Sequence, residues 1–239
     1  MPAGCSTYVQ DFAAGGSPHT CSSQGVQSFL LFSDETLVIF QNRGELFFLD
    51  FHSLLVEVDV APLLATPPVL IDASAQMLAQ ARRRLAAINC RATVVEGDAF
   101  DLPFPSQFDL VYTFRLIRHF ELEDRRRLYR QIARVLKPGG MLVFDAVNEV
   151  VSRPLRERAS ADEHRHFDAL LTPDRLRQEL REEGFEVERL VGVQHQYPLL
   201  LQTQILVGPR SRFLARAAME VIDRLGGEPL EWVVMCRRK

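Results

Sequence analysis

The sequence has only four cysteines, and no two of them lie close together along the chain. Cys5, Cys21, Cys90 and Cys236 lie far apart among the 239 residues, and none belongs to a CxxC motif. This spacing gives no disulfide framework and no zinc site, and it fits the reducing cytoplasm. We expect no metal.

Other absences narrow the class of protein. The chain has no run of 18 apolar residues, and its first 25 residues lack the basic and apolar regions of a signal peptide. The net charge is −3, and arginines are interspersed with glutamates, so the positive stripe of a nucleic-acid-binding protein is missing. We therefore expect a cytoplasmic protein that binds a small molecule, with neither a nucleic-acid nor a membrane partner.

Basic residues are nearly absent from the first part of the chain. Residues 1–68 contain one, Arg43, against seven acidic residues, whereas residues 69–239 contain 27 basic and 24 acidic residues. Residues 1–27 are rich in Gly, Ser and Thr, and short apolar runs separated by turn residues follow up to residue 51. We predict an atypical, partly disordered segment at residues 1–45, with irregular or β-hairpin structure, and an α/β domain at residues 46–239.

From residue 69 onward, strand-like runs alternate with helical patterns. The expected strands are 69–72, 92–98, 108–114, 141–147, 185–193 and 230–236, and the expected helices are 74–88, 122–136, 172–184 and about 211–225. In the last helix the spacing predicts that Leu214, Val221 and Leu225 are buried, together with Ala218 and Ile222. The alternation is typical of a mostly parallel sheet with helices on both faces.

Four segments in this part resemble one known family in their order and spacing. They are "VLIDASAQMLAQARRRL", "VVEGDAFDLPFPSQFDLVYTFRLIRHF", "IARVLKPGGMLVFDAVN", and "LTPDRLRQELREEGFEV" with "LEWVVMCRR". Residues 69–239 are thereby similar to class I S-adenosylmethionine-dependent methyltransferases of the ubiquinone/menaquinone-biosynthesis type. The resemblance implies a Rossmann-like sheet with an antiparallel C-terminal strand. It also implies methyl transfer from S-adenosyl-L-methionine to an O, N or C atom of a small-molecule acceptor, and we expect a homodimer.

The resemblance assigns roles to residues at two strand ends. Asp72, followed by Ala73, would accept hydrogen bonds from the ribose hydroxyls, and Met77 would pack on the adenine. Asp98 would accept from the adenine amino group, while the Ala99 backbone N–H would meet a ring nitrogen. The alternatives are turn or capping aspartates and a core methionine.

Further roles follow at the next strand end. Phe114 and Arg115 would approach the methionine part of the cofactor. In "RLIRHF", where relatives often have two histidines, Arg118 precedes His119, and His119 would act as a general base; the alternative is a partly exposed loop histidine. In "GVQHQYP", His195 and Tyr197 would belong to an element that covers the substrate.

One part of the family pattern is missing. A first strand should end in an acidic residue followed by a GxGxG-like loop, yet no glycine occurs between Gly44 and Gly97. A right-handed crossover to the strand at Val69 needs about a dozen residues, and the run ending at Phe51 leaves 17. We therefore predict Leu46–Phe51 as the central strand. Asp50, 22 residues before Asp72, would then be the family's first acidic residue.

Two explanations of the missing loop are open. Out-of-frame translation upstream of about residue 69 would account for the charge imbalance and for the abrupt start of the resemblance. Alternatively, the chain is a non-catalytic relative, a pseudoenzyme that kept the scaffold for binding or interaction.

Overall fold

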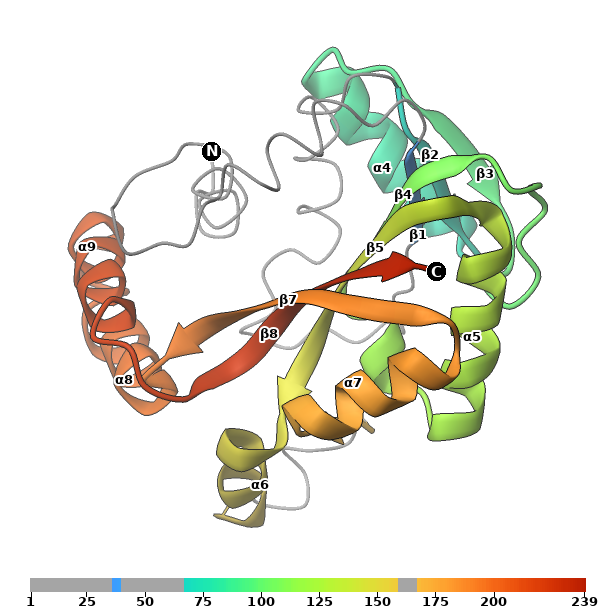
Figure 1. The fold of residues 1–239 in the computed structure, drawn as a ribbon. Helices are drawn as coiled ribbons and strands as arrows, with labels where there is room; N and C mark the ends of the chain where they lie inside the picture. Colours follow the sequence, from blue (N-terminus) through green and yellow to red (C-terminus); the bar gives the residue numbers. More distant parts are fainter. Residues whose placement is uncertain (1–35, 40–66, 159–166) are drawn as a thin grey trace.

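The computed structural model describes residues 36–39 (as backbone), 67–158 and 167–239. The described strands form one eight-stranded sheet with the order β3-β2-β1-β4-β5-β8-β7, and β6 pairs with β5 beside this path (Figure 1). The strands are β1 (Thr36–Ile39), β2 (Val69–Asp72), β3 (Thr93–Glu96), β4 (Phe108–Thr113), β5 (Leu136–Asn148), β6 (Leu170–Leu171), β7 (Phe185–His195) and β8 (Pro229–Arg238).

The sheet is parallel except around β8. Strands β1 to β5 pair in parallel, whereas β8 lies antiparallel between β5 and β7. Short apolar runs that alternate with helices produce the parallel part, because each crossover helix returns the chain to the same end of the sheet. The predicted α/β class, with a mostly parallel sheet and an antiparallel C-terminal strand, is confirmed.

The prediction for the central strand was wrong. The position between β2 and β4 is occupied by β1, with Leu37 opposite Val69 on one side and opposite Val111 on the other. The minimum crossover length is only a lower bound, and the 29 residues between β1 and β2 satisfy it as well as the 17 after Phe51. Leu46–Phe51 and the boundary between residues 45 and 46 lie outside the described residues.

Local signals in the sequence begin and end the helices. The helices are α4 (Ala75–Ala87), η2 (Ile117–His119, a 3₁₀ turn), α5 (Leu122–Val135), α6 (Glu149–Arg158), α7 (Pro173–Glu182), α8 (Tyr197–Leu206) and α9 (Arg212–Asp223). Ser74 and Thr172 cap α4 and α7 by accepting from Met77 N and Arg175 N, and Pro173 occupies the first turn of α7. Gly184 follows α7 with φ of 84°, a left-handed conformation that glycine adopts without strain.

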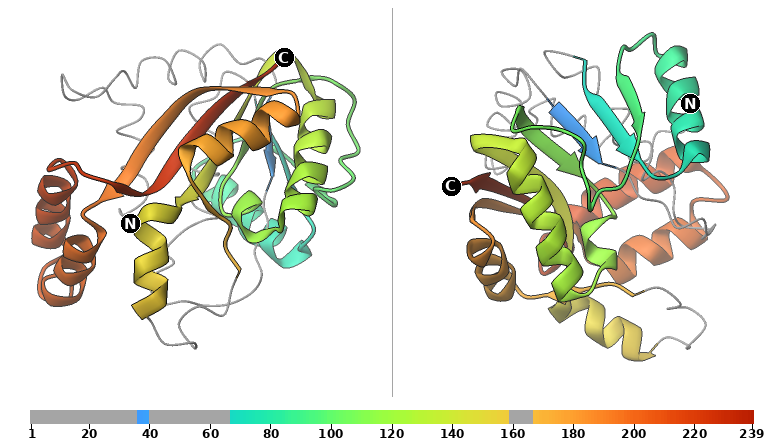
Figure 2. Two further views of the ribbon diagram at one scale, coloured as in Figure 1. Left: turned by 60° about the horizontal axis from the view of Figure 1, so that its bottom comes forward. Right: turned by 90° about the vertical axis from the view of Figure 1, so that its right-hand side faces the viewer.

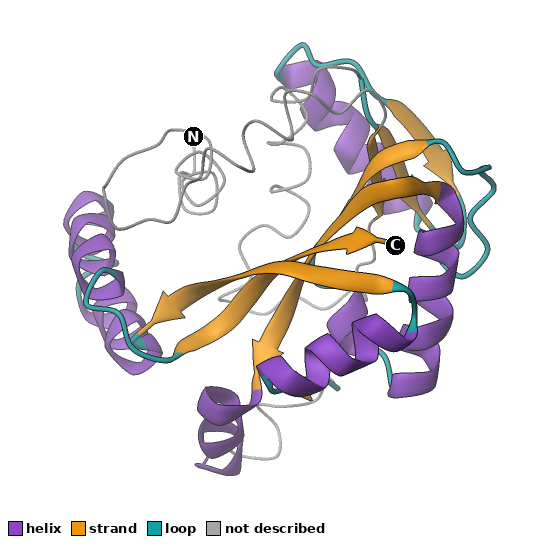
Figure 3. Cartoon of the chain, viewed as in Figure 1, coloured by secondary structure: helices purple, strands orange, loops and turns teal. Residues whose placement is uncertain are grey.

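Helices cover both faces of the sheet, as Figures 2 and 3 show. On one face, side chains of α5 and α7 pack with sheet residues such as Phe144 and Trp232. On the other face, Ala81 and Leu85 of α4 pack with sheet residues such as Leu110. Two hydrophobic cores therefore hold the strands in place. The carboxyl ends of the parallel strands lie along one edge of the sheet.

The last helix is less buried than its periodicity predicts. Leu214, Val221 and Leu225 are 58%, 60% and 67% exposed, so the prediction that they are buried was wrong, whereas Ala215 is buried. In the described structure α9 packs with α8 and β7 at the far end of the β7–β8 ribbon (Figure 1). Periodicity identifies an amphipathic helix but not what its apolar face meets.

Among the described residues, no helix is both long enough and apolar enough to cross a membrane.

Candidate functional site

Asp72 ends β2 at the carboxyl edge of the sheet. Its side chain is buried, and Oδ1 accepts a hydrogen bond from the backbone N–H of Ser74 at 2.5 Å. Among the described residues, Oδ2 is buried and has no hydrogen-bond partner. Burial raises the pKa of the carboxyl above its ordinary value, and the bond from Ser74 opposes that rise only in part. A buried carboxylate oxygen without a donor is a group that a ligand hydroxyl could satisfy.

Asp98 lies beside Asp72 at the end of the neighbouring strand. Asp72 is opposite Glu96 in the parallel register, and Gly97 N donates to the Asp72 carbonyl at 3.1 Å. The Asp98 side chain is exposed, and its Oδ1 accepts from Phe100 N at 2.9 Å. The structure therefore brings the two predicted carboxylates together at one edge, one covered and one open to solvent.

The end of β4 carries Phe114 and Arg115. Phe114 is half-buried, with its ring 5.0 Å from that of Tyr112. Arg115 has φ of 53°, in the left-handed region, and its backbone N donates to Asp145 Oδ1 of β5 at 2.6 Å. A non-glycine residue in this conformation is held there by its surroundings, here by a buried carboxylate on the adjacent strand.

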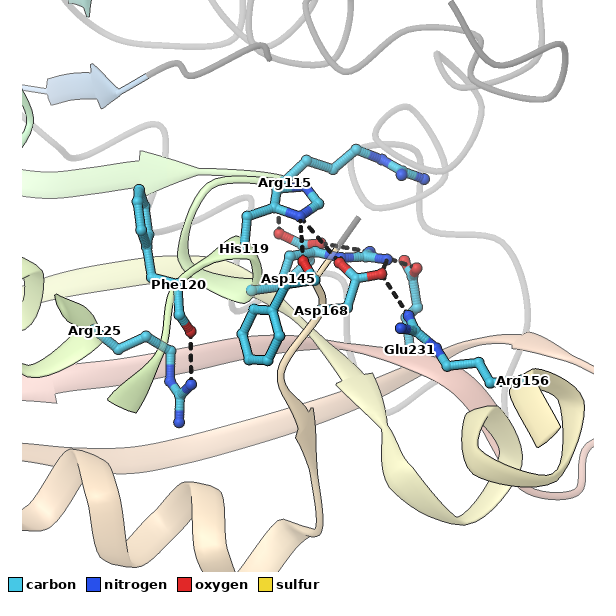
Figure 4. A network of polar contacts seen from close by, with 10 residues as sticks. Arg115, His119, Phe120, Arg125, Asp145, Arg156, Asp168 and Glu231 are labelled. Atoms are coloured by element: carbon cyan, nitrogen blue, oxygen red, sulfur yellow. Dashed lines mark hydrogen bonds and ion pairs between the residues drawn. The ribbon is translucent and has the colours of Figure 1, made fainter. Parts of the chain in front are cut away.

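A cluster of charged groups surrounds Arg118 (Figure 4). The guanidinium is 8% exposed and contacts three carboxylates: Nε meets Asp168 Oδ1 at 2.8 Å, and Nη1 meets Asp145 Oδ2 at 3.2 Å and Glu231 Oε1 at 2.6 Å. Arg156 of α6 contacts the second oxygen of Asp168. These groups come from five elements or connections, so the cluster joins η2, β5, α6, β8 and the segment before β6.

The charges in this cluster shift one another's pKa values. Burial alone would raise the pKa of Asp168, but hydrogen bonds from His119 and Arg118 lower it well below its ordinary value. Burial likewise opposes ionisation of Glu231 and Arg118, yet their mutual attraction lowers the pKa of Glu231 and raises that of Arg118. All three groups are therefore held in their charged forms.

His119 stands at the border of the cluster. Its Nδ1 lies 3.1 Å from Asp168 Oδ1 and 3.1 Å from the Phe167 carbonyl oxygen, and its side chain is 27% exposed. The next residue, Phe120, packs edge-on against Phe100, with ring centroids 4.9 Å apart. Since Phe100 follows Asp98 by two residues, this contact links the turn after β3 to the histidine.

The remaining predicted site residues are distributed as follows. Ala73 is exposed between Asp72 and the cap of α4, Met77 is half-buried in the first turn of α4, and Ala99 is half-buried against the core. Asp50 lies outside the described residues. His195 ends β7, and Asp223 of α9 accepts from its backbone N at 2.7 Å and lies 3.1 Å from Nδ1, a separate pair from the contacts around Arg118.

Sequence reasoning missed the partners of Arg118. Asp145, Asp168 and Glu231 are 27, 50 and 113 residues away from it along the chain. A signal was present for Asp145 alone, since an acidic residue interrupts the apolar run "MLVFDAV" of a predicted interior strand. In the described ranges, no group of three or more His, Cys, Asp or Glu side chains could hold a metal ion.

Comparisons with known proteins agree with this geometry. Residues 60–140 match the family described as a methyltransferase domain. The 27-O-demethylrifamycin SV methyltransferase of Amycolatopsis mediterranei is 34% identical over 108 residues, which are 43% of this chain and 39% of that protein. The chain thus spans about two fifths of the length of the curated relatives that it matches first.

Solved structures show the same fold. A SAM-dependent methyltransferase from Methanosarcina mazei has a TM-score of 0.60 and 16% identity, covering 90% of this chain and 97% of that one. The [4+2]-cyclase SpnF has a TM-score of 0.56 and 18% identity, covering 97% and 91%. The second likeness shows that this fold by itself does not fix the reaction.

The open, mostly parallel sheet has the α/β arrangement in which ligands bind outside the carboxyl ends of the strands. The chain is similar in sequence, over part of its length, and in fold, over most of it, to S-adenosylmethionine-dependent methyltransferases. The predicted resemblance is confirmed, and none of these matches favours the non-catalytic alternative.

Proposed function

We propose that the chain binds S-adenosylmethionine at the carboxyl ends of β2, β3 and β4 and transfers its methyl group to an O, N or C atom of a small molecule. The observation that carries the proposal is the buried Asp72 Oδ2, which lacks a hydrogen-bond partner among the described residues. Leaving such an oxygen unsatisfied costs free energy, which a ribose hydroxyl donating to it would recover.

The position of Asp98 supports the same assignment. Two carboxylates at adjacent strand ends can accept from a sugar and from a purine amino group of one nucleoside, because neighbouring strands lie about 5 Å apart. Ala73, Met77 and Ala99 border these groups, and Phe114 and Arg115 follow the strand on the other side of β1. We assign these five residues to the remaining contacts with the cofactor.

Binding must uncover Asp72. The side chain is only 2% exposed, so the groups that cover Oδ2 have to move aside when the ribose enters. The missing glycine loop removes backbone donors that the family resemblance implies, and we therefore expect weaker binding than a complete loop would give.

The protein's part in catalysis is alignment. S-adenosylmethionine supplies a methyl group on a sulfonium, which is already activated for in-line displacement. The chain has to hold the acceptor atom opposite the sulfur and exclude water, and the rigid edge formed by β2 to β5 is suited to that task. A homodimer and a cytoplasmic location stay predictions of the sequence.

Calorimetric titration with S-adenosylhomocysteine up to millimolar concentration tests the proposal. We expect binding to the wild-type chain and a loss of about 10- to 100-fold in Asp72→Ala, the range expected for hydrogen bonds to a charged group. Asp101→Ala is the matched control, because it removes an exposed carboxylate from the turn that contains Asp98.

Two outcomes would overturn the assignment. A folded wild-type chain that gives no heat at millimolar ligand would reject cofactor binding. Equal losses in Asp72→Ala and Asp101→Ala would show that general charge, and not the strand end, governs the affinity.

A further inference from the structure

Exposed apolar side chains are concentrated in one segment of the described structure. Residues 197–225 form α8, α9 and their connection, a helical hairpin inserted between β7 and β8 (Figures 1 and 2). This segment carries seven of the eleven large apolar side chains that are exposed in the described ranges. Four of them, Ile205, Leu206, Phe213 and Leu214, flank the connection and are 58% to 79% exposed. Single exposed apolar residues are common, whereas a group of them in one segment marks a surface that makes contacts.

The two helices have more apolar surface than the described fold covers. α9 packs with α8 and β7, and Ala215 is buried. Leu214 and Val221 lie about two turns apart on one side of α9, and both are more than half exposed. α8 contains no charged residue, although Leu199 and Leu206 are exposed. A helix that is apolar on all sides is normally covered, so this side of the hairpin lacks its partner in the described part of the chain.

The connection between the helices is positively charged. Residues 205–214, "ILVGPRSRFL", contain two arginines and no acidic residue, and we call them the hairpin tip. The side chain of Arg210 is exposed, and its Nη1 donates to the Leu206 carbonyl at 2.6 Å. Over residues 197–225, four arginines against two acidic residues give a net charge of +2, whereas the whole chain has −3. The hairpin tip therefore combines exposed apolar side chains with positive charge.

We propose that the hairpin tip inserts into the surface of a membrane that contains anionic lipids. Leu206 and Phe213 enter the boundary between headgroups and acyl chains, while Arg210 stays at the level of the lipid phosphates. Helices α8 and α9 have 10 and 12 residues, too few to cross a bilayer, so the hairpin lies on the membrane and does not span it. The proposal goes beyond the proposed function, and neither depends on the other.

The charge of the hairpin tip favours anionic lipid over a second copy of the chain. A two-fold contact between two tips would bring like charges together, because each tip has arginines and no acidic residue. Like charges that face each other across an interface cost free energy, whereas an anionic lipid surface attracts each arginine near it. The sequence-based expectation of no membrane partner rested on the lack of a spanning run, which a hairpin at the membrane surface does not need.

Co-sedimentation of the whole chain with lipid vesicles tests the proposal. We expect binding to vesicles of phosphatidylcholine and phosphatidylglycerol in equal parts, and much weaker binding to vesicles of phosphatidylcholine alone. Phe213→Ser should lower the partition coefficient on the anionic vesicles about 10- to 100-fold, the range expected when one large apolar side chain is no longer buried. Arg210→Gln should lower it about fivefold, since one positive charge close to the anionic surface is lost.

Val150→Ser is the matched control. Val150 is 57% exposed on α6, outside the hairpin, so its replacement removes an exposed apolar side chain without changing the hairpin tip. This variant should bind the anionic vesicles as tightly as the wild type. Equal losses in Phe213→Ser and Val150→Ser would overturn the proposal, and so would a wild-type chain that does not sediment with the anionic vesicles.

Fluorescence of Phe213→Trp gives a readout at the hairpin tip itself. The chain has one tryptophan, Trp232, which is buried in the core and gives a constant background. Anionic vesicles should shift the emission of Phe213→Trp to shorter wavelength, because the indole leaves water. An unchanged emission maximum would contradict insertion.

Sedimentation velocity without lipid distinguishes the other occupant of this surface. We expect Phe213→Ser to leave the oligomeric state of the chain unchanged. A dimer that Phe213→Ser dissociates, in a chain that does not bind vesicles, would assign the hairpin tip to a contact between two copies and overturn the proposal.

Discussion

Asp72 is buried and Asp168 is half-buried near the carboxyl edge of the sheet, and their surroundings are opposite. Asp168 contacts Arg118, Arg156 and His119, and the contacts with His119 and Arg118 outweigh burial and lower the pKa of its carboxyl. Asp72 accepts one backbone hydrogen bond, has an unpartnered oxygen, and its pKa is raised by burial.

The difference separates two uses of a carboxylate that is largely removed from water. A carboxylate that is fully paired with cations stabilises the arrangement of its partners and orients them. A carboxylate that is left unsatisfied is destabilised until a ligand supplies the missing donors. Within this chain, the first kind holds the region around η2 together and the second kind marks the proposed nucleoside site.

Removing the cation at the centre of the paired cluster should have the largest effect. Arg118→Met leaves Asp145, Asp168 and Glu231 without their shared partner, and we expect a loss of about 3–5 kcal/mol in the free energy of unfolding. Urea denaturation followed by circular dichroism measures it. Arg127→Met, which breaks an exposed pair with Asp124, should change stability little, and a similar loss in both variants would contradict the role of burial.

Replacing Asp72 and Asp168 by asparagine should have different effects on the free energy of unfolding. Asp168→Asn removes one charge from a paired network and should cost about 1.5–3 kcal/mol, whereas Asp72→Asn should leave the free energy of unfolding unchanged or raise it by up to about 1 kcal/mol. The same urea titrations at neutral pH measure both. If Asp72→Asn is as destabilising as Asp168→Asn, then Asp72 is a structural partner and not a site awaiting a ligand.

The pH dependence of stability should distinguish the two carboxyls by sign. The folded-state pKa of Asp72 is raised above 3.8, so the folded chain binds more protons than the unfolded chain at pH values between 3.8 and the raised pKa. The contribution of Asp72 to the free energy of unfolding therefore falls as pH rises through this range. For Asp168, whose pKa is lowered, the contribution is present above 3.8 and is lost as pH falls through the lowered value.

Urea titrations of the two asparagine variants over a pH series measure these contributions. The stability of Asp72→Asn relative to the wild type should increase as pH rises above 3.8. The stability of Asp168→Asn relative to the wild type should instead decrease as pH rises, and this change should occur at pH values below 3.8. Curves of the same sign would contradict the comparison.

Two helix caps give the smallest effects. Ser74 Oγ and Ser211 Oγ each accept from the helical backbone at 3.3 Å, at the starts of α4 and α9. Replacing either serine by alanine should cost about 1 kcal/mol in the free energy of unfolding. Only Ser74→Ala should also weaken binding of S-adenosylhomocysteine in calorimetry, because the cap fixes the turn whose backbone N–H holds Asp72. Equal effects of Ser74→Ala and Ser211→Ala on binding would show that the cap of α4 does not contribute to the nucleoside site.

Local chemistry made much of the fold predictable. The cap at Ser74, the proline at the start of α7 and the apolar runs of β2, β4 and β8 are each specified within a few residues. The acidic strand ends at Asp72 and Asp98 were predictable for the same reason, since a charged residue that closes an apolar run marks the edge of a parallel sheet.

Non-local contacts were not predictable. Which apolar run would become the central strand depended on pairing with both β2 and β4, and spacing permitted more than one candidate. The exposed apolar side of α9 shows the same limit, because periodicity does not say which surface lies opposite a helix.

The sequence by itself determined the alternation of strands and helices, the family resemblance and the two acids at neighbouring strand ends, because these depend on short-range patterns of hydropathy and charge. The tertiary structure alone decided that Arg118 would gather three carboxylates and that Asp168 would contact both Arg118 and His119. The physical reason is that a buried charge is stable only with partners close in space, and here those partners come from distant parts of the chain.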